Sequence, residues 1–195
     1  FDITKEKNYL TLLNYLKKNN FKIDSVVHCA YPRTKIWGKK LEDVKYKDLK
    51  NNIETQLSSS ILISQIFFDY FKKHKGGNII LFSSIYGFSI PNFEIYESKY
   101  ISPLEYSVVK SGIITIAKYI AKYSKNLNIR INCISPGGLK DKTQSQTFQR
   151  KYKNLSLNKG LLDPNDIVGT VLFLLSDSSK YINGQNIVID DGRTL

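Results

Sequence analysis

The segment Asn78-Ile-Ile-Leu-Phe-Ser-Ser84 is a nearly continuous apolar run that ends in two hydroxyl side chains. Such runs are typical of strands in a parallel sheet, because helices cover both faces of the sheet and leave little room for polar residues. Lysines and Gly76-Gly77 come just before it, as they do at the C-terminus of many helices. The segment therefore predicts a helix followed by a buried parallel strand.

The same alternation continues on either side of this segment. Periodicity predicts helices at residues 6–19, 49–74, 104–124 and 163–175, the last with Asp163 as N-cap and Pro164 in its first turn. Apolar runs predict further strands at residues 23–30, 129–134 and 186–190, with a short helix in the loop 31–48. Residues 139–162 are polar and basic. This order predicts an α/β fold, a doubly wound parallel sheet, in one domain over residues 1–195.

Ligands of doubly wound sheets bind at the carboxyl ends of the strands. Three groups follow predicted strands there: His28-Cys-Ala-Tyr31, Ser83-Ser84 and Ser135-Pro-Gly-Gly138. The helix that carries Tyr106 begins at the same edge, because it follows the strand that ends at Ser84. We therefore expect these groups to surround one site.

Tyr106 and Lys110 lie four residues apart, and so on one face of the predicted helix 104–124. A phenol titrates near pH 10 unaided. An ammonium about 4 Å away, at an effective dielectric of roughly 20, would stabilise the phenolate by about 4 kcal/mol and bring the phenol pKa towards about 7. Such a phenol suits general acid and base catalysis. The same spacing recurs at Tyr31/Lys35 and Tyr46/Lys50, which fall in a predicted loop and at a helix entry.

Composition limits the possible function classes. The chain of 195 residues is 42% hydrophobic and 12% aromatic, which is ordinary for a globular protein. No apolar run is long enough to span a membrane and the start has no signal-peptide layout, so we expect a cytoplasmic protein. The net charge of +12 comes from lysines scattered over nearly every segment, whereas a nucleic-acid binder would cluster them with arginine and aromatic residues.

Cys29 and Cys133 are the two cysteines, and neither has a His or Cys at zinc-ligand spacing. We therefore expect reduced, buried thiols and no metal site. The sequence contains no Met, even at position 1, which predicts a fragment or a processed product.

Taken together, these residues resemble the short-chain dehydrogenase/reductase family. Matching elements cover nearly the whole chain in the family's order: Asp2, Ala30, Ser84 with Gly87, Tyr106 with Lys110, Asn132 with Pro136-Gly137, and Ile182-Asn-Gly-Gln-Asn-Ile-Val-Ile-Asp-Asp-Gly192. The resemblance implies hydride transfer between NAD or NADP and an alcohol or carbonyl.

The resemblance also implies a role for each matching residue. Tyr106 would exchange the hydroxyl proton, Lys110 would lower its pKa and bind the nicotinamide ribose, and Ser84 would hydrogen-bond the reacting oxygen. The remaining residues would bind cofactor: Pro136 and Gly137 along the nicotinamide pocket, Ala30 beside it, and Asp2 at the adenine.

The sequence departs from the family in several places. Asp2 corresponds to the end of the family's third strand, so we expect the fold to lack its first two βα units. The family's glycine-rich phosphate loop is missing with them, and we therefore expect this chain alone not to bind dinucleotide tightly. Gln56 stands where the family has the Asn of its proton relay, and Asp141 replaces a Thr. Tyr31 follows Ala30 where the family has Gly. The spacing from Ser84 to Tyr106 is unusually long, so residues 92–100 should add a loop over the site.

The departures resemble a subgroup, the oxidoreductases of flagellin modification and nonulosonic acid pathways. This implies an anionic sugar or nucleotide-sugar substrate, with Arg33 as a natural phosphate partner. Two alternatives stay open: a catalytically silent scaffold, suggested by Gln56 and Asp141, and a 3-oxoacyl-ACP-reductase-like enzyme. The basic residues of 139–160 suit an anionic ligand in either enzyme.

By resemblance, the helices 49–74 and 104–124 would pair with their copies in a homodimer or homotetramer.

Overall fold

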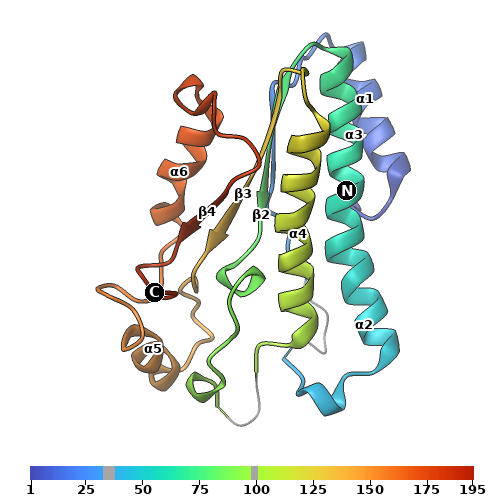
Figure 1. The fold of residues 1–195 in the computed structure, drawn as a ribbon. Coiled ribbons are helices and arrows are strands. Elements are labelled where there is room, and N and C mark those ends of the chain that lie inside the picture. Colours follow the sequence, from blue (N-terminus) through green and yellow to red (C-terminus); the bar gives the residue numbers. More distant parts are fainter. Residues whose placement is uncertain (33–37, 98–100) are drawn as a thin grey trace.

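The protein is described by a computed structural model that covers residues 1–32, 38–97 and 101–195 (Figure 1). Its centre is a parallel sheet in the order β1-β2-β3-β4. The strands are β1 (Ser25–His28), β2 (Gly77–Phe82), β3 (Ile129–Pro136) and β4 (Asn186–Ile189). In register, Val27 pairs with Ile80, and Ile80 with Asn132. The predicted α/β fold with a parallel sheet is confirmed.

Helices alternate with these strands, as predicted from the sequence. The predicted helix 49–74 is a continuous helical rod in three parts, with a π-helical segment in the middle. The helices are α1 (Glu6–Lys18), α2 (Tyr46–Asn52), the π-helix η2 (Ile53–Ser58), α3 (Ser59–Lys73), α4 (Leu104–Tyr123), α5 (Gln146–Lys153) and α6 (Asn165–Leu175), with short 3₁₀ turns η1 (Leu41–Asp43), η3 (Ile85–Gly87), η4 (Phe93–Ile95) and η5 (Asp177–Ser179).

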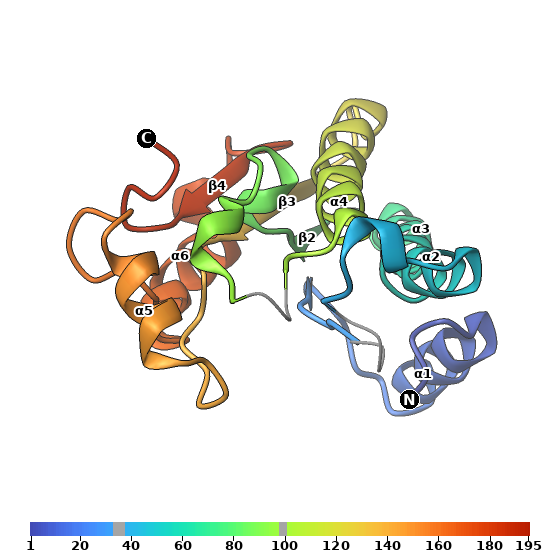
Figure 2. The ribbon, with the colours of Figure 1, turned by 90° about the horizontal axis from the view of Figure 1, so that it is seen from below.

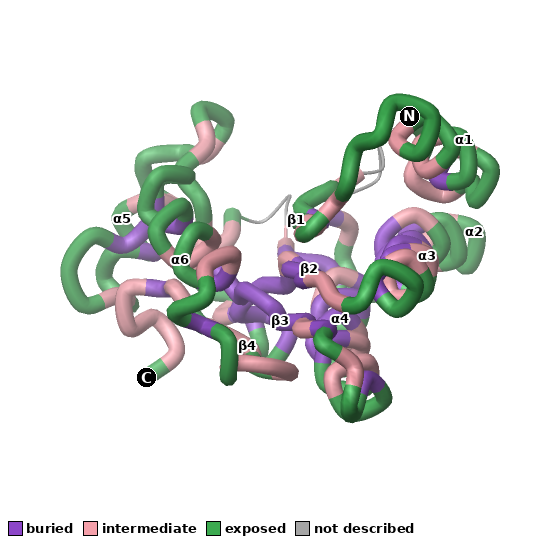
Figure 3. The backbone as a smooth tube through the Cα atoms, turned by 90° about the horizontal axis from the view of Figure 1, so that it is seen from above, coloured by how far each residue is buried: buried purple, intermediate pink, exposed green. Residues whose placement is uncertain are grey.

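Both faces of the sheet are covered, which explains the apolar run in β2. Ile79 and Leu81 point to the face covered by α1, α3 and α4 and join the larger hydrophobic core there. Ile80 points to the opposite face and packs with Ile167 and Leu174 of α6. Figure 2 shows the two layers of helices on either side of the strands, and Figure 3 shows buried residues concentrated along β2 and β3.

Helix α5 was not predicted from the sequence. Only Phe148 and Tyr152 are apolar in it, and these two rings pack with Ile95 and Leu161 in a small separate core. Ser145 begins the helix, because its Oγ accepts a hydrogen bond from Phe148 N at 3.1 Å. A charged helix of eight residues with so few apolar positions gives little periodicity to detect.

Two predicted details are wrong. The N-cap of α6 is Pro164 without a side-chain cap, because the Asp163 carboxylate instead pairs with Lys159 at 2.8 Å. Cys29 is exposed rather than buried, because it follows the end of β1 at the open carboxyl edge of the sheet. Cys133, inside β3, is buried as expected.

Candidate active site

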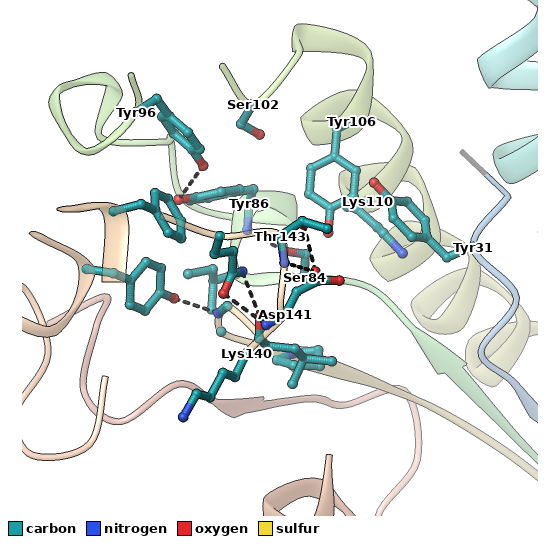
Figure 4. A pocket seen from close by; sticks show the side chains of 18 of the residues that line it. Tyr31, Ser84, Tyr86, Tyr96, Ser102, Tyr106, Lys110, Lys140, Asp141 and Thr143 are labelled. Carbon is teal, nitrogen blue, oxygen red and sulfur yellow. Dashed lines mark hydrogen bonds between the residues drawn. The ribbon is translucent and has the colours of Figure 1, made fainter. Parts of the chain in front are cut away.

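A cavity of about 780 Å³ opens at the carboxyl edge of the sheet. Its walls come from the segments after β1, β2 and β3, from the first turns of α4, and from the segment that leads into α5. Figure 4 shows side chains from these separate elements pointing into the same space. Five of the residues predicted to form the site line it: Ser84, Tyr106, Lys110, Pro136 and Gly137.

Lys110 lies deep in this cavity, with only 5% of its surface exposed. Its Nζ donates a hydrogen bond to Phe82 O at 3.0 Å and lies 5.6 Å from the centroid of the Tyr106 ring. Burial lowers the pKa of Lys110 to about 8, with a smaller opposing effect from Cys133. The lysine is therefore still mainly a cation at neutral pH, held one helical turn from Tyr106.

Ser84 is fixed at the end of β2 by its own turn. Its Oγ accepts a hydrogen bond from Tyr86 N at 3.2 Å at the start of η3. The neighbouring Ser83 donates its hydroxyl to Lys110 O at 2.6 Å, which binds the strand end to α4. Gly87 completes the contact, because a Cβ there would lie 2.8 Å from the Lys110 carbonyl. These contacts hold Ser84 and the Tyr106/Lys110 face in one arrangement.

The Tyr46/Lys50 pair is not comparable, because Tyr46 is 80% exposed at the start of α2. Lys35, the partner of Tyr31 in the third pair, lies outside the described residues. Position on the cavity wall therefore distinguishes Tyr106/Lys110 from Tyr46/Lys50, which has the same spacing.

Four tyrosines that the sequence analysis did not assign also line the cavity. Tyr31 meets the Tyr106 ring edge-on at 5.5 Å between centroids, and its own ring lies 5.1 Å from Lys110 Nζ. The Tyr96 hydroxyl donates to the Tyr86 hydroxyl at 3.1 Å, which joins the predicted loop 92–100 to η3. Tyr152 is the fourth. Tyr31 belongs to the group after β1 that the sequence analysis expects at this edge. Tyr86 lies soon after the end of β2, and that position was the available signal for it.

The turn after β3 forms the opposite wall. Gly138 N donates to the Tyr152 hydroxyl at 2.6 Å, so α5 holds this turn in place. Gly137 packs tightly, because a Cβ there would lie 3.1 Å from both Asp190 Cα and the Tyr152 hydroxyl. A rigid wall of backbone beside an ammonium and two hydroxyls fits the ribose and carboxamide of a nicotinamide, which present hydroxyl and amide groups.

Gln56 and His28 lie behind the cavity rather than on its wall. Gln56 is buried in η2, where its Nε2 donates to Pro32 O at 3.1 Å and its backbone carbonyl accepts from Ser60 Oγ at 2.6 Å. His28 Nε2 lies 3.2 Å from the same Ser60 Oγ. Burial, with a smaller contribution from the Lys110 charge, lowers the pKa of His28 to about 4. π-helical segments such as η2 occur frequently at functional sites.

Asp2 and Ala30, which the sequence analysis expects to bind the cofactor, do not line the cavity. Asp2 is exposed and accepts hydrogen bonds from Thr4 near the start of α1. Ala30 is not among the lining residues, although Cys29 and Tyr31 on either side of it are. Asp141 lines the cavity and accepts hydrogen bonds from the backbone and hydroxyl of Thr143. Arg33 lies outside the described residues.

Within residues 1–32, 38–97 and 101–195, no group of three or more His, Cys, Asp or Glu could hold a metal ion. In the same residues no helix is both long and apolar enough to span a bilayer.

Comparison with known proteins gives matches over almost the entire chain. Residues 1–194 match the family model described as Enoyl-(Acyl carrier protein) reductase. The chain is 42% identical over 193 residues to post-translational flagellin modification protein A of Campylobacter coli, an alignment that covers 98% of this chain and 75% of that protein. It is 29% identical over 153 residues to a 3-oxoacyl-acyl-carrier-protein reductase of Thermotoga maritima, covering 76% of this chain and 58% of that protein.

Among solved structures, a short chain dehydrogenase from Leptospira borgpetersenii with bound NAD⁺ superposes with a TM-score of 0.91 at 36% sequence identity. The match covers 100% of this chain and 74% of that one.

Proposed function

Because the chain belongs to the short-chain dehydrogenase/reductase family and is thus an NAD(P)-dependent oxidoreductase, we propose that it interconverts an alcohol and a carbonyl on a sugar or nucleotide sugar used in flagellar or surface glycan synthesis. The observation that carries the proposal is the convergence of Ser84, Tyr106 and Lys110 on one cavity at the carboxyl edge of the sheet. The flagellin modification protein at 42% identity supports the substrate class.

Tyr106 acts as the general acid when a carbonyl is reduced. Its hydroxyl gives a proton to the substrate oxygen, and a bound nicotinamide would supply the hydride to the carbon. In the oxidation direction the Tyr106 phenolate takes the proton from the alcohol. Ser84 donates a hydrogen bond to the same oxygen. Lys110 stabilises the phenolate that Tyr106 leaves behind, and the burial of Lys110 strengthens this attraction because the effective dielectric constant is lower there.

The cofactor-binding roles in this proposal are those that the family resemblance implies. Tyr106 and Lys110 would bind the nicotinamide ribose, and Pro136 and Gly137 would border the ring. Ala30 would lie beside the cofactor, and Asp2 would contact its adenine. Gln56 would bind the water molecule of the family's proton relay. It lies in the buried η2 segment, which packs against α4.

The direct test is turnover, by the full-length protein, of a panel of nucleotide sugars and sugar phosphates with NAD⁺, NADP⁺ and their reduced forms. Tyr106→Phe should lower kcat/KM by about 10²–10⁴-fold, because only the proton-transferring hydroxyl is removed. Tyr46→Phe is the matched control, since it removes the same hydroxyl from the exposed Tyr46/Lys50 pair and should leave turnover unchanged.

A 3-oxoacyl thioester belongs in the same panel, because the family model and the Thermotoga maritima reductase both point to acyl substrates. Turnover of the thioester alone would replace the sugar assignment and keep the mechanism. Turnover that survives Tyr106→Phe would contradict the mechanism. No turnover with any substrate and either cofactor would favour the scaffold alternative.

A further inference from the structure

A second, smaller cavity of about 330 Å³ lies beside α5. Four cationic side chains line it, from the turn after β3, from α5 and from the segment before α6: Lys140, Arg150, Lys153 and Lys159. Asp163 is the one carboxylate among its lining residues within the described part of the chain. So high a density of one charge in a small concavity is a local feature, unlike the lysines scattered elsewhere.

Most of this positive charge is not neutralised by the protein. Lys159 pairs with Asp163 at 2.8 Å and also with Asp166. Among the described residues, Lys140, Arg150 and Lys153 have no carboxylate within 4.0 Å. Three cations therefore line the cavity without a paired carboxylate, and together they give it a positive potential that attracts anions.

The cations are held by a fixed support. The Tyr152 hydroxyl and Gly138 N join α5 to the turn after β3, and on the far side Lys151 Nζ donates to Glu94 O at 2.8 Å. The backbone of Lys140 is fixed as well, because its N–H donates to Leu162 O at 2.8 Å. Arg150 and Lys153, three residues apart on α5, lie on neighbouring positions of one helix face. The backbone that carries the cations is thus fixed, while their side chains are exposed at the surface.

Lys140 connects the two cavities, because it lines both. Figure 4 shows its side chain extending away from Tyr106 and Lys110. A ligand whose reacting carbon lies at Tyr106 could therefore continue past the turn at residues 137–141 and reach the cations of α5.

We propose that this second cavity binds the phosphoryl groups of the substrate, so that the enzyme acts on a phosphorylated sugar or nucleotide sugar. This proposal rests on the proposed function for its choice of substrate. Each phosphoryl group carries up to about two negative charges and several acceptor oxygens, which suits a guanidinium fork flanked by two ammonium groups. The small volume favours a compact anion over a folded protein surface.

The test measures binding without turnover. Inorganic pyrophosphate is titrated by calorimetry into the full-length protein, with and without saturating NADH. Arg150→Ala and Lys153→Ala should each weaken pyrophosphate binding about tenfold, because each removes a charge-assisted contact that is partly screened by solvent. Lys142→Ala is the matched control: Lys142 lies two residues from Lys140, lines neither cavity, and should not matter.

Each alternative result has one meaning. Absence of pyrophosphate binding to the unmodified protein, or equal weakening in Lys142→Ala, would overturn the proposal while leaving the oxidoreductase assignment intact. Displacement of pyrophosphate by NADH would assign the anion to the cofactor instead and would also overturn it. Selective loss of acyl carrier protein binding in Arg150→Ala, with pyrophosphate unaffected, would assign the patch to a protein partner. Pyrophosphate binding without any sugar turnover would support the site and contradict the proposed function.

Discussion

At the scale of single residues, burying the Lys110 ammonium group in the site lowers the stability of the folded protein. Lys110 is almost fully buried, and burial lowers its pKa from 10.5 to about 8. The folded protein therefore binds this proton less tightly than the unfolded chain does. The destabilisation is fully present below pH 8 and is relieved as the pH rises towards 10.5, and it amounts to about 3 kcal/mol.

Replacing this lysine should separate stability from activity. Lys110→Met keeps much of the side-chain volume and removes the buried charge, so the free energy of unfolding at pH 7 should rise by about 1–3 kcal/mol. The kcat/KM should fall by about 10³-fold, because the Tyr106 phenolate loses its neighbouring cation. Urea unfolding and steady-state kinetics measure the two effects. A variant that is less stable and still active would show that Lys110 is structural.

His28 should make the protein sensitive to acid. Its pKa is about 4 in the folded protein and about 6.5 when unfolded, so only the unfolded chain takes up the proton between these values. Stability should therefore fall by up to about 3 kcal/mol as the pH drops from 6.5 to 4. His28→Gln should flatten this part of the stability curve measured by urea unfolding, while the exposed His74→Gln should not. Identical slopes in all three proteins would contradict the assignment.

At the scale of elements, a buried polar pair joins the helical rod to α4. Asn52 is fully buried at the end of α2, and its Nδ2 donates to Glu105 Oε1 at 2.9 Å. Glu105 directly precedes Tyr106 and is buried as well. No other donor bonds its carboxylate within the described chain, since Oε2 has no partner there. The hydrogen bond from Asn52 therefore offsets part of the free-energy cost of burying the Glu105 carboxyl group.

Removing that donor should be costly. Asn52→Ala leaves the Glu105 carboxyl without its hydrogen bond and should lower the free energy of unfolding by about 2–3 kcal/mol, measured by urea unfolding. Asn51→Ala, at the exposed neighbouring position, provides the control and should change stability by less than about 0.5 kcal/mol. Equal effects of the two substitutions would mean that helix propensity, not the pair, governs the loss.

The elements that the sequence predicted well are those with strong periodicity. Most covered positions of β2 and α4 are apolar, apart from Asn78, Glu105 and Lys110, so their type and place follow from pattern alone. α5 was missed because its place depends on a distant contact, the bond between the Tyr152 hydroxyl and Gly138 N. The start of α6 was misplaced because Asp163 bonds Lys159 rather than capping the helix.

The same contrast holds within the site. Ser84, Tyr106 and Lys110 were predictable because strand ends of a parallel sheet meet at one edge. The approach of Tyr31 to Tyr106 was not, because it depends on the path of the chain after β1. Nor could the sequence show that only some of the basic residues in 139–160, among them Arg150 and Lys153, line a common cavity.

At the scale of the whole molecule, large apolar side chains remain exposed on the outer face of the α3/α4 layer. They include Tyr119 and Tyr123, whose rings stack on each other, with Val108 on α4 and Ile61 on α3. Large exposed apolar residues on two neighbouring helices are typical of interaction surfaces. We propose that these helices form the contact in the homo-oligomer expected from the sequence.

We therefore expect light scattering to give the mass of a homodimer or homotetramer. The double substitution Ile61→Glu/Val108→Glu should shift the mass to a smaller species, because it introduces charges into the desolvated centre of the contact. Leu10→Glu, on the exposed side of α1, is the control and should leave the mass unchanged. A monomeric mass for the unmodified protein would refute the prediction.

The exposed thiol of Cys29 has a practical consequence. It lies on the wall of the larger cavity next to Tyr31, whereas burial raises the pKa of Cys133, the other thiol, to about 12 and so suppresses its reactivity. An alkylating reagent would consequently label a single sulfur atom, that of Cys29, on the wall of this cavity. The rate of that labelling provides a reporter of occupancy that needs neither a known substrate nor any turnover.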